Sequence, residues 1–434
     1  MLSWASRFRL RQYVRASLWI VPLLGLVLGV VLAECAIAAH RSAWVPPGWH
    51  YSATTASGVL SAIVGAMIGL LGFVVTIGVL VVQQATGTLS PRYMRLWYRD
   101  RLQKAVLATF TGTFAFAFSL LRKIEPDDVP DLGVTLAGIG VAVSLVLLLV
   151  YLNRFTHNLR PVAIADLVRR MGLNVLDQAL TAARAATPTE TGIAVPDDGG
   201  PVNPVRAERG GAIQAFHVSG LRAVALRHDC VLVVTHRIGD FVPPGTVLVE
   251  VRGDTPGLDP RLLLGMIATG AERTIDQDPA FALRVLVDIA VRALSPAVND
   301  PTTAVQLLDH IDAFLHTIAR VELPDRHVLA DDRGRPLLVV PGRTWEDYLE
   351  LAVTEIREYG AGSLQICRRL RAVLNGLSTT VSAERVPAVR KELSLLDAAV
   401  QHKFHDPAHR ALARTADRQG IGGGRRPETA ESAD

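Results

Sequence analysis

The chain has 434 residues, enough for about two or three domains, and half of them are apolar, so its mean hydropathy is high for a soluble protein. The formal net charge of +4 gives no strong attraction to nucleic acid, and we expect no nucleic-acid partner. The three cysteines lie far apart, which excludes a disulfide framework, a CxxC redox pair and a zinc knuckle.

Four apolar stretches in the first part of the chain are long enough to cross a membrane. A spanning helix needs roughly 17–25 mostly apolar residues for a hydrocarbon core about 30 Å thick. The stretches cover residues 16–38, 58–82, 105–121 and 132–152. The first is longer than the apolar part of a secretory signal, so we expect it to be retained. The sequence therefore predicts a membrane α-helical fold with a four-helix transmembrane domain over 16–152.

Arginine is concentrated in three segments beside these stretches. They are the N-terminus 1–15, the loop after the second stretch and the segment after the fourth: Arg7, Arg9, Arg11 and Arg15; Arg92, Arg95, Arg99, Arg101 and Lys104; Arg154, Arg160, Arg169 and Arg170. Positively charged loops stay in the cytoplasm. We therefore predict a multi-pass protein of the bacterial plasma membrane with both termini cytoplasmic. The same clusters suit anionic lipid headgroups as partners in the bilayer.

The second stretch carries Gly65, Gly69 and Gly72, and the Gly65–Gly69 spacing allows two helix backbones to approach closely. This pattern favours packing inside the four-helix unit. A contact between subunits of a homo-oligomer, or the lining of a pore, is the alternative. Glu34 lies near the outer end of the first stretch, which favours an interfacial acid over a proton relay.

The rest of the chain is predicted to form a cytoplasmic α+β domain. A membrane-proximal helix over 153–184, broken or kinked at Pro161, leads to a Pro- and Gly-rich linker over 185–210. A β-rich subdomain follows over 211–253, where apolar and polar residues alternate. Its segment "GDFVPPGTVLVEV" resembles half of a barrel-sandwich domain that carries biotin or lipoate on lysine. The block contains no lysine, so we expect no such cofactor.

Residues 259–403 are predicted to be mainly helical, and residues 412–434 to be a disordered tail. A small hairpin interrupts the helices at "HVLADDRGRPLLVV" and turns at Asp331–Gly334. Thr344 is expected to cap the next helix, because Asp347 follows it three residues later as in a capping box.

The stretch "ALSPAVNDPTTA" separates two helical patterns. Asp300 followed by Pro301 is a strong helix start, an N-cap and then proline at the first helical position. A structural turn is therefore favoured. The turn does not explain why so many polar residues gather there, and these form a candidate ligand or ion site: Asp288, Arg292, Ser295, Asn299, Asp300, Thr302 and Thr303. A helix N-terminus suits an anion, whereas Asp300 suits a cation.

Four segments spread over most of the chain resemble a bacterial family of predicted membrane proteins, domain of unknown function 2254. They are "LSPRYMRLWYRDRLQKAVLATF", "RIGDFVPPGTVLVEV", "ALSPAVNDPTTA" and "YLELAVTEIREYGAGS". The resemblance implies an integral membrane protein and no particular activity.

Catalytic signatures are missing from the sequence. It contains no GxxxxGK[ST], GxSxG or HExxH motif, so we expect no enzyme. His402, His405, His409 and Asp406 are interpreted as a chance cluster, and no metal is expected. Two functions remain: an oligomeric passive channel or transport protein gated by its cytoplasmic domain, or a membrane-anchored regulatory or scaffold protein that binds a partner or small ligand. Few buried charges favour an anchor or a passive pore over a pump.

Overall fold

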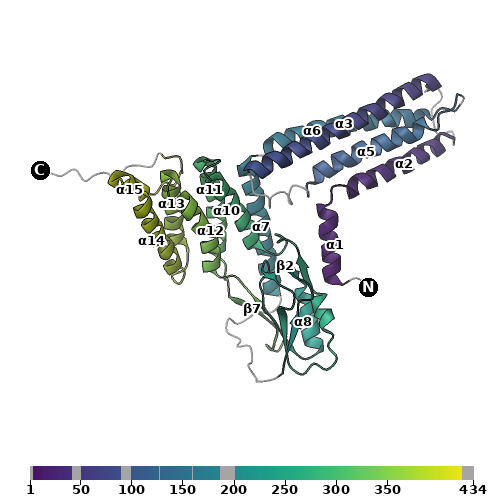
Figure 1. Cartoon of the computed structure of the whole chain (residues 1–434). Helices are drawn as coiled ribbons and strands as arrows, with labels where there is room; N and C mark the ends of the chain where they lie inside the picture. The colour runs from purple at the N-terminus through teal and green to yellow at the C-terminus, as the bar shows by residue number, and fades with distance from the viewer. Residues whose placement is uncertain are drawn as a thin grey trace. The chain divides into compact units, whose positions relative to one another are not determined.

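The computed structural model describes residues 3–41, 50–88, 99–126, 128–158, 160–185 and 201–422. The chain forms two compact units, drawn in Figure 1. Unit 1 comprises Met1–Arg11 and Pro161–Asp434, and unit 2 comprises Gln12–Arg160. The chain therefore leaves unit 1 within helix α1 (Trp4–Ala16), builds unit 2 and then returns to unit 1.

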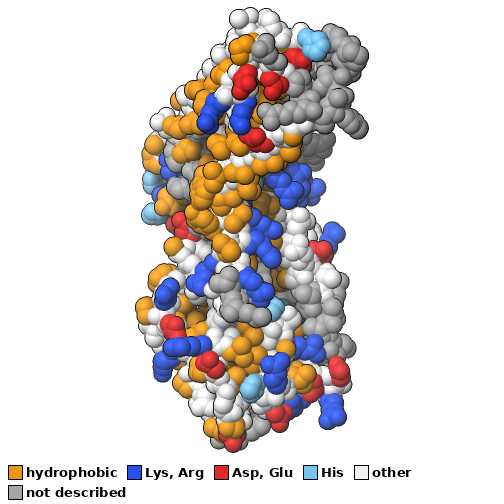
Figure 2. All heavy atoms as spheres, turned by 90° about the vertical axis from the view of Figure 1, so that its right-hand side faces the viewer, with side chains coloured by type: hydrophobic (Ala, Val, Ile, Leu, Met, Phe, Trp, Pro, Cys, Tyr) orange, Lys and Arg blue, Asp and Glu red, His pale blue; other side chains and the backbone are white. Residues whose placement is uncertain are grey.

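Unit 2 consists mainly of four long apolar helices, α2 (Ile20–Arg41), α3 (Ala53–Thr88), α5 (Arg101–Leu121) and α6 (Asp131–Asn158). Each contains a helical segment of at least 20 residues that is long and apolar enough to cross a membrane. The four apolar helices that the sequence predicts are therefore present, each long enough to cross a membrane. Figure 2 shows hydrophobic side chains gathered over the upper part of one face, and exposed large apolar residues include Leu24, Leu28 and Val31 of α2.

Helix α5 is the most buried helix of unit 2. Phe110 and Leu120 of α5 are fully buried, as are Leu60 and Met67 of α3. Ser144 is also buried, and its hydroxyl donates to the backbone oxygen of Gly140 at 2.7 Å, which satisfies it inside α6. Apolar side chains thus fill the space between the four helices.

Two sheets lie in unit 1. The five-stranded sheet has the order β1 (Val202–Arg206), β5 (Val247–Arg252), β3 (Val231–Val234), β8 (Pro336–Pro341) and β7 (Arg326–Ala330). The three-stranded sheet has the order β4 (Phe241–Val242), β2 (Gly211–Phe216) and β6 (Ile267–Gly270). Ile213 and Phe216 of the smaller sheet share a core with Leu232 and Leu338 of the larger one.

The sheets correct three predictions. Strand β1 occupies part of the predicted linker 185–210, because it pairs with β5 from Val202 to Arg206; residues 186–200 lie outside the described residues. Helix α8 (Val218–Arg227) interrupts the predicted β-rich subdomain 211–253. The predicted hairpin forms as β7 and β8, but β8 also pairs in parallel with β3, so it extends the main sheet. The predicted likeness to a barrel-sandwich domain is not confirmed by this topology.

Helices make up most of the rest of unit 1: α7 (Pro161–Ala185), α9 (Pro260–Leu264), α10 (Pro279–Ala293), α11 (Pro301–Ile318), α12 (Trp345–Gly360), α13 (Leu364–Thr380), α14 (Val386–Lys403) and α15 (Pro407–Ala413). As predicted, a helix boundary lies at Pro161. Helix α10 lies deep in the core, since Leu283, Leu286 and Val287 are fully buried. Proline cannot donate a backbone hydrogen bond, so it suits the first helical position at which α10 and α11 begin.

The predicted disordered tail 412–434 is ordered in its first part. Asp417 is buried, and its carboxylate accepts backbone hydrogen bonds from Gln419, Gly420 and Gly422. Gln365 of α13 donates to the backbone oxygen of Gly420. Residues 423–434 lie outside the described residues.

The first residues of α1 pack on the three-stranded sheet. The Trp4 ring stacks on His217 with centroids 5.0 Å apart, and Ala5 is buried beside Ala215 and Ala268. The backbone N–H of Ala5 donates to Gly265 at 2.8 Å. These contacts anchor the start of the chain within unit 1.

Candidate functional site

The predicted turn between α10 and α11 forms where the sequence places it. Asp300 is the N-cap of α11: one carboxylate oxygen accepts the Thr303 backbone N–H at 3.0 Å, and the other accepts the Thr303 hydroxyl at 2.5 Å. The Asp300 backbone N–H donates to Ala293, the last residue of α10. Both oxygens of Asp300 are thus occupied by the capping of its own helix.

The other residues of the turn also serve its backbone. The Ser295 hydroxyl donates to the backbone oxygen of Arg292 at 2.7 Å, and the Asn299 backbone N–H donates to Ser295 at 2.8 Å. Asn299 has a φ of +47°, a left-handed conformation that asparagine tolerates better than most residues. Thr302 is exposed. The contacts fit the structural interpretation of the turn, and a ligand or ion at these residues stays a prediction.

Asp288 belongs to an ion cluster between α10 and α12. Arg284 donates a hydrogen bond to Asp288 at 2.7 Å. It also donates one to each carboxylate oxygen of Glu355, at 2.5 and 2.6 Å. The hydrogen bond with Glu355 is the largest of the effects that raise the pKa of Arg284 above its ordinary value. Two-pronged pairs of this kind fix both geometry and charge. The cluster therefore holds α10 against α12.

The three candidate glycines of α3 face away from the rest of unit 2. A Cβ atom at Gly65, Gly69 or Gly72 would meet no described heavy atom within 4 Å outside its own helix segment. Among the described residues, these glycines do not pack against another helix of the four-helix unit. The interpretation of them as packing positions inside that unit is therefore wrong. Close packing occurs instead between α2 and α5, where a Cβ atom at Gly25 would lie 2.3 Å from the Ala108 carbonyl oxygen.

Small residues recur along the exposed side of α3 around these glycines, and the exposed large side chains of Ile68 and Phe73 lie beside them. We call it the small-residue face of α3; it comprises Gly58, Ser61, Ala62, Gly65, Ala66, Gly69, Gly72 and Thr76. The Thr76 hydroxyl donates to the backbone oxygen of Gly72 at 2.9 Å. No residue of this face is charged, and its glycines expose their backbone.

Unit 1 contains a cavity of about 240 Å³ that no sequence motif indicates. It lies where the N-termini of α10 and α12 meet near the turn that contains Gly239. Asp278 is the N-cap of α10 and is only 3% exposed. One of its oxygens accepts the Phe281 backbone N–H at 3.2 Å, and the other is buried without a hydrogen-bond partner among the described residues.

Burial raises the pKa of Asp278 to about 6, although the positive charge of Arg343 opposes this shift. A Cβ atom at Gly239 would lie 2.5 Å from the free Asp278 oxygen and 3.5 Å from an Arg343 nitrogen. Gly239 has a φ of +93° and is thus suited to this position. The sequence signal was the Asp278–Pro279 pair, the same helix start as Asp300–Pro301.

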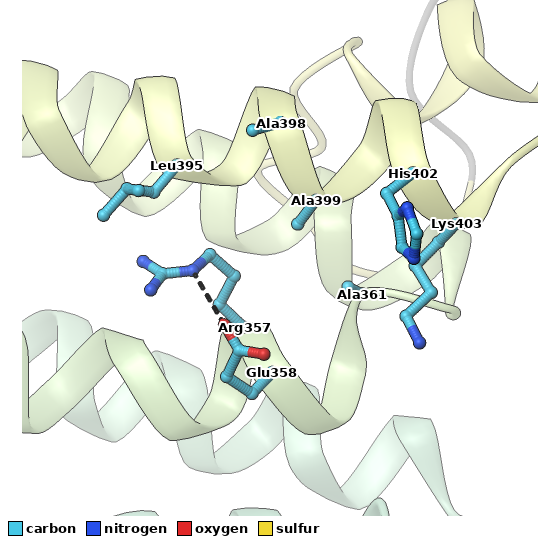
Figure 3. Close-up of a pocket in the computed structure, with 8 residues that line it drawn as sticks. All are labelled: Arg357, Glu358, Ala361, Leu395, Ala398, Ala399, His402 and Lys403. Atoms are coloured by element: carbon cyan, nitrogen blue, oxygen red, sulfur yellow. Dashed lines mark ion pairs between the residues drawn. The ribbon is translucent and has the colours of Figure 1, made fainter.

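Figure 3 shows another cavity of about 260 Å³, between α12 and α14. Its most buried charge, Arg357, pairs with the buried Glu392 and lies 3.8 Å from Glu358. Arg357 is therefore neutralised inside the protein. His402 and Lys403 line the same cavity. Among the described residues, no group of three or more His, Cys, Asp or Glu side chains could hold a metal ion.

Comparisons with known proteins agree with the four apolar helices. The family model of DUF2254, a predicted membrane protein, matches residues 15–376. The uncharacterized protein Mb1321c of Mycobacterium bovis and the uncharacterized protein Rv1290c of Mycobacterium tuberculosis are each 31% identical to this chain over 419 residues, which cover 92% of this chain and 79% of the relative. No solved structure matches. The chain belongs to the DUF2254 family of predicted membrane proteins.

Proposed function

We propose that this protein is a self-associating protein of the bacterial plasma membrane whose copies meet through the small-residue face of α3 and enclose a passive path for solutes. Both termini and unit 1 lie in the cytoplasm in this proposal, which the arginine-rich segments beside the helices support. The observation that carries the proposal is that Gly65, Gly69 and Gly72 have no described neighbour within 4 Å of a Cβ position.

The small-residue face suits a helix of a second copy better than it suits lipid. Leu24 and Leu28 of α2 offer large apolar side chains to lipid tails, whereas the α3 face offers glycine backbone, alanine methyl groups and hydroxyls beside the exposed Phe73. Small residues let two membrane helices approach until their backbones touch. The α2–α5 contact at Gly25 illustrates this mode of packing within the same chain.

A path for solutes would lie between copies rather than inside one copy. Phe110, Met67 and Leu120 fill the space between the four helices. Glu34 is exposed and lies 4.0 Å from Lys123, so this pair is a surface contact rather than a proton relay. A pump that moves protons or ions relies on ionisable side chains inside the membrane. A passive path fits the uncharged α3 face better.

The test combines oligomeric state with solute flux. Purified protein would be sized in detergent and reconstituted into liposomes loaded with an ion-sensitive dye. Gly69→Leu is expected to abolish both association and flux. Gly138→Leu is the matched control, because a Cβ atom at Gly138 on α6 also meets open space. A wild-type protein that stays monomeric, or a Gly69→Leu variant that associates normally, would refute the proposal.

The alternative function is a membrane-anchored regulatory or scaffold protein. The observation that favours it is the charged cavity of unit 1 beside Asp278, which has no role in a passive path. Association through α3 without flux of any cation or anion would support this function. The exposed Arg7, Arg9 and Arg11 of α1 support anionic lipids as partners in either case.

A further inference from the structure

Three segments converge at the cavity beside Asp278. The N-terminus of the 15-residue helix α10 contributes Asp278 and Phe281, and the N-terminus of the 16-residue helix α12 begins just after Arg343. Gly239 lies against Asp278 and Arg343 from the turn between β3 and β4. Helix N-termini carry partial positive charge and favour negatively charged groups nearby.

Two of the six charged side chains that line the cavity are already held in ion pairs. Arg284 is held by Glu355 and Asp288. Asp347 accepts from Arg237 at 2.9 Å and from the Thr344 backbone N–H at 3.0 Å. These ion pairs build the walls, so they do not define what the cavity binds.

Two arginines of the lining remain for a ligand, and so does the exposed carboxylate of Glu350. Arg273 is exposed and has no hydrogen bond or ion pair with a described residue. Arg343 makes one long hydrogen bond, at 3.3 Å, with the backbone oxygen of Ile238. Arginine forks recognise phosphate and carboxylate groups. Together with the two helix N-termini these arginines suit an anion, whereas the carboxylates of Asp278 and Glu350 favour one that still carries a proton.

Asp278 restricts which anion fits. An ionised carboxylate only accepts hydrogen bonds, so it repels an anion that carries no proton. Arg343 and the free Asp278 oxygen lie on the same side of Gly239, yet they form no ion pair in the described structure. A group that accepts from Arg343 and donates to Asp278 would satisfy both. Hydrogen phosphate does this at neutral pH because it keeps one proton, whereas sulfate does not.

We propose that the cavity lined by Arg273, Asp278 and Arg343 binds a protonated phosphate group, either free or at the end of a small molecule or lipid, and that Asp278 accepts its P–O–H hydrogen bond. A volume of about 240 Å³ lies below the roughly 300–1,000 Å³ of pockets for drug-sized ligands, which fits a group of this size. The site is separate from the α3 face, so it does not depend on self-association.

The experiment is calorimetric titration of the purified full-length protein with inorganic phosphate and with sulfate at pH 7. Wild type is expected to bind phosphate at least about tenfold more tightly than sulfate, the size of one hydrogen bond to a charged group. Asp278→Asn should bring the two affinities close together, since an amide can both donate and accept. Arg343→Gln should weaken both anions by about tenfold.

Arg320→Gln is the matched control, because Arg320 is an exposed arginine of unit 1 outside the cavity lining. It should leave both affinities unchanged. Wild type that fails to bind phosphate, or that binds sulfate equally well, would overturn the proposal without recourse to any variant. If Asp278→Asn keeps the full preference for phosphate, Asp278 does not accept a hydrogen bond from the bound phosphate.

A competition experiment distinguishes a lipid headgroup from a soluble compound as the source of the phosphate group. Nanodiscs that contain phosphatidic acid, whose headgroup is a phosphate monoester, are compared with nanodiscs of phosphatidylcholine alone. Loss of phosphate binding only in the presence of phosphatidic acid would identify a lipid headgroup as the occupant. Unchanged phosphate binding in both would identify a soluble phosphate compound.

Discussion

A Cβ atom at Gly29 would lie 2.2 Å from the carbonyl oxygen of Gly112, so α2 and α5 contact each other backbone to backbone. Gly29→Leu should therefore separate the two helices, because a backbone oxygen cannot move aside as a flexible side chain does. We expect a loss of about 3 kcal/mol or more in the stability of unit 2, at the upper end of overpacking costs. Thermal unfolding in detergent, followed by circular dichroism, measures this loss.

Gly69→Leu is the matched comparison for this prediction. Gly69 meets open space, so the substitution should leave the unfolding temperature of the detergent-solubilised monomer unchanged. Equal destabilisation by the two variants would mean that the outward position of Gly69 is wrong.

Asp300→Ala should destabilise unit 1 by roughly 1 kcal/mol, the usual cost of removing an N-cap. The lost contacts are the two hydrogen bonds from Thr303. Asp300→Asn keeps a capping oxygen and should cost much less. Denaturant or thermal unfolding of the three proteins provides the comparison. A ligand response lost from Asp300→Ala at an unchanged melting temperature would show that the turn is a binding site.

The buried carboxyl of Asp278 should make stability depend on pH. Its pKa is raised to about 6 by burial, whereas an unfolded aspartate titrates near pH 4. Between about pH 4 and pH 6 the unfolded chain has released this proton while the folded protein keeps it. The stabilising contribution is therefore complete below about pH 4 and is lost as the pH rises through about 6, a change of about 3 kcal/mol.

Asp278→Asn removes this titration and isolates it from the other acids. The stability of Asp278→Asn relative to wild type should rise between pH 4 and pH 7 and level off above that range. Melting temperatures of both proteins in matched buffers without phosphate test this. A difference that does not vary with pH would mean that the Asp278 carboxyl keeps its ordinary pKa in the folded protein.

Local sequence chemistry predicted those features whose partners lie within a few residues. The Asp300 cap and the Thr344–Asp347 capping box depend on contacts over three residues, and the β7–β8 hairpin pairs residues 6 to 15 positions apart. The four membrane helices follow from length and apolar composition, which are also local properties.

Features made by distant segments could not be predicted in this way. Asp278, Gly239 and Arg343 lie close together in the fold but far apart in the sequence, so no spacing marks their cavity. Asp417 in the predicted tail lies 3.9 Å from Arg368 of α13, a contact that composition cannot indicate. Helix α3 is apolar all round, and without a polar side its sequence does not reveal which glycines face outward.

Arg357 and Glu392 form a buried ion pair between α12 and α14, beside the cavity in Figure 3. Both side chains are less than a tenth exposed, at 7% and 6%. Arg357→Leu alone should cost about 3–5 kcal/mol, because it leaves the Glu392 charge buried without a partner. The double variant Arg357→Leu with Glu392→Leu should recover most of this loss, since no unpaired charge remains. Unfolding of the two single variants and the double variant gives the coupling energy directly, and additive losses would mean that the two residues do not depend on each other.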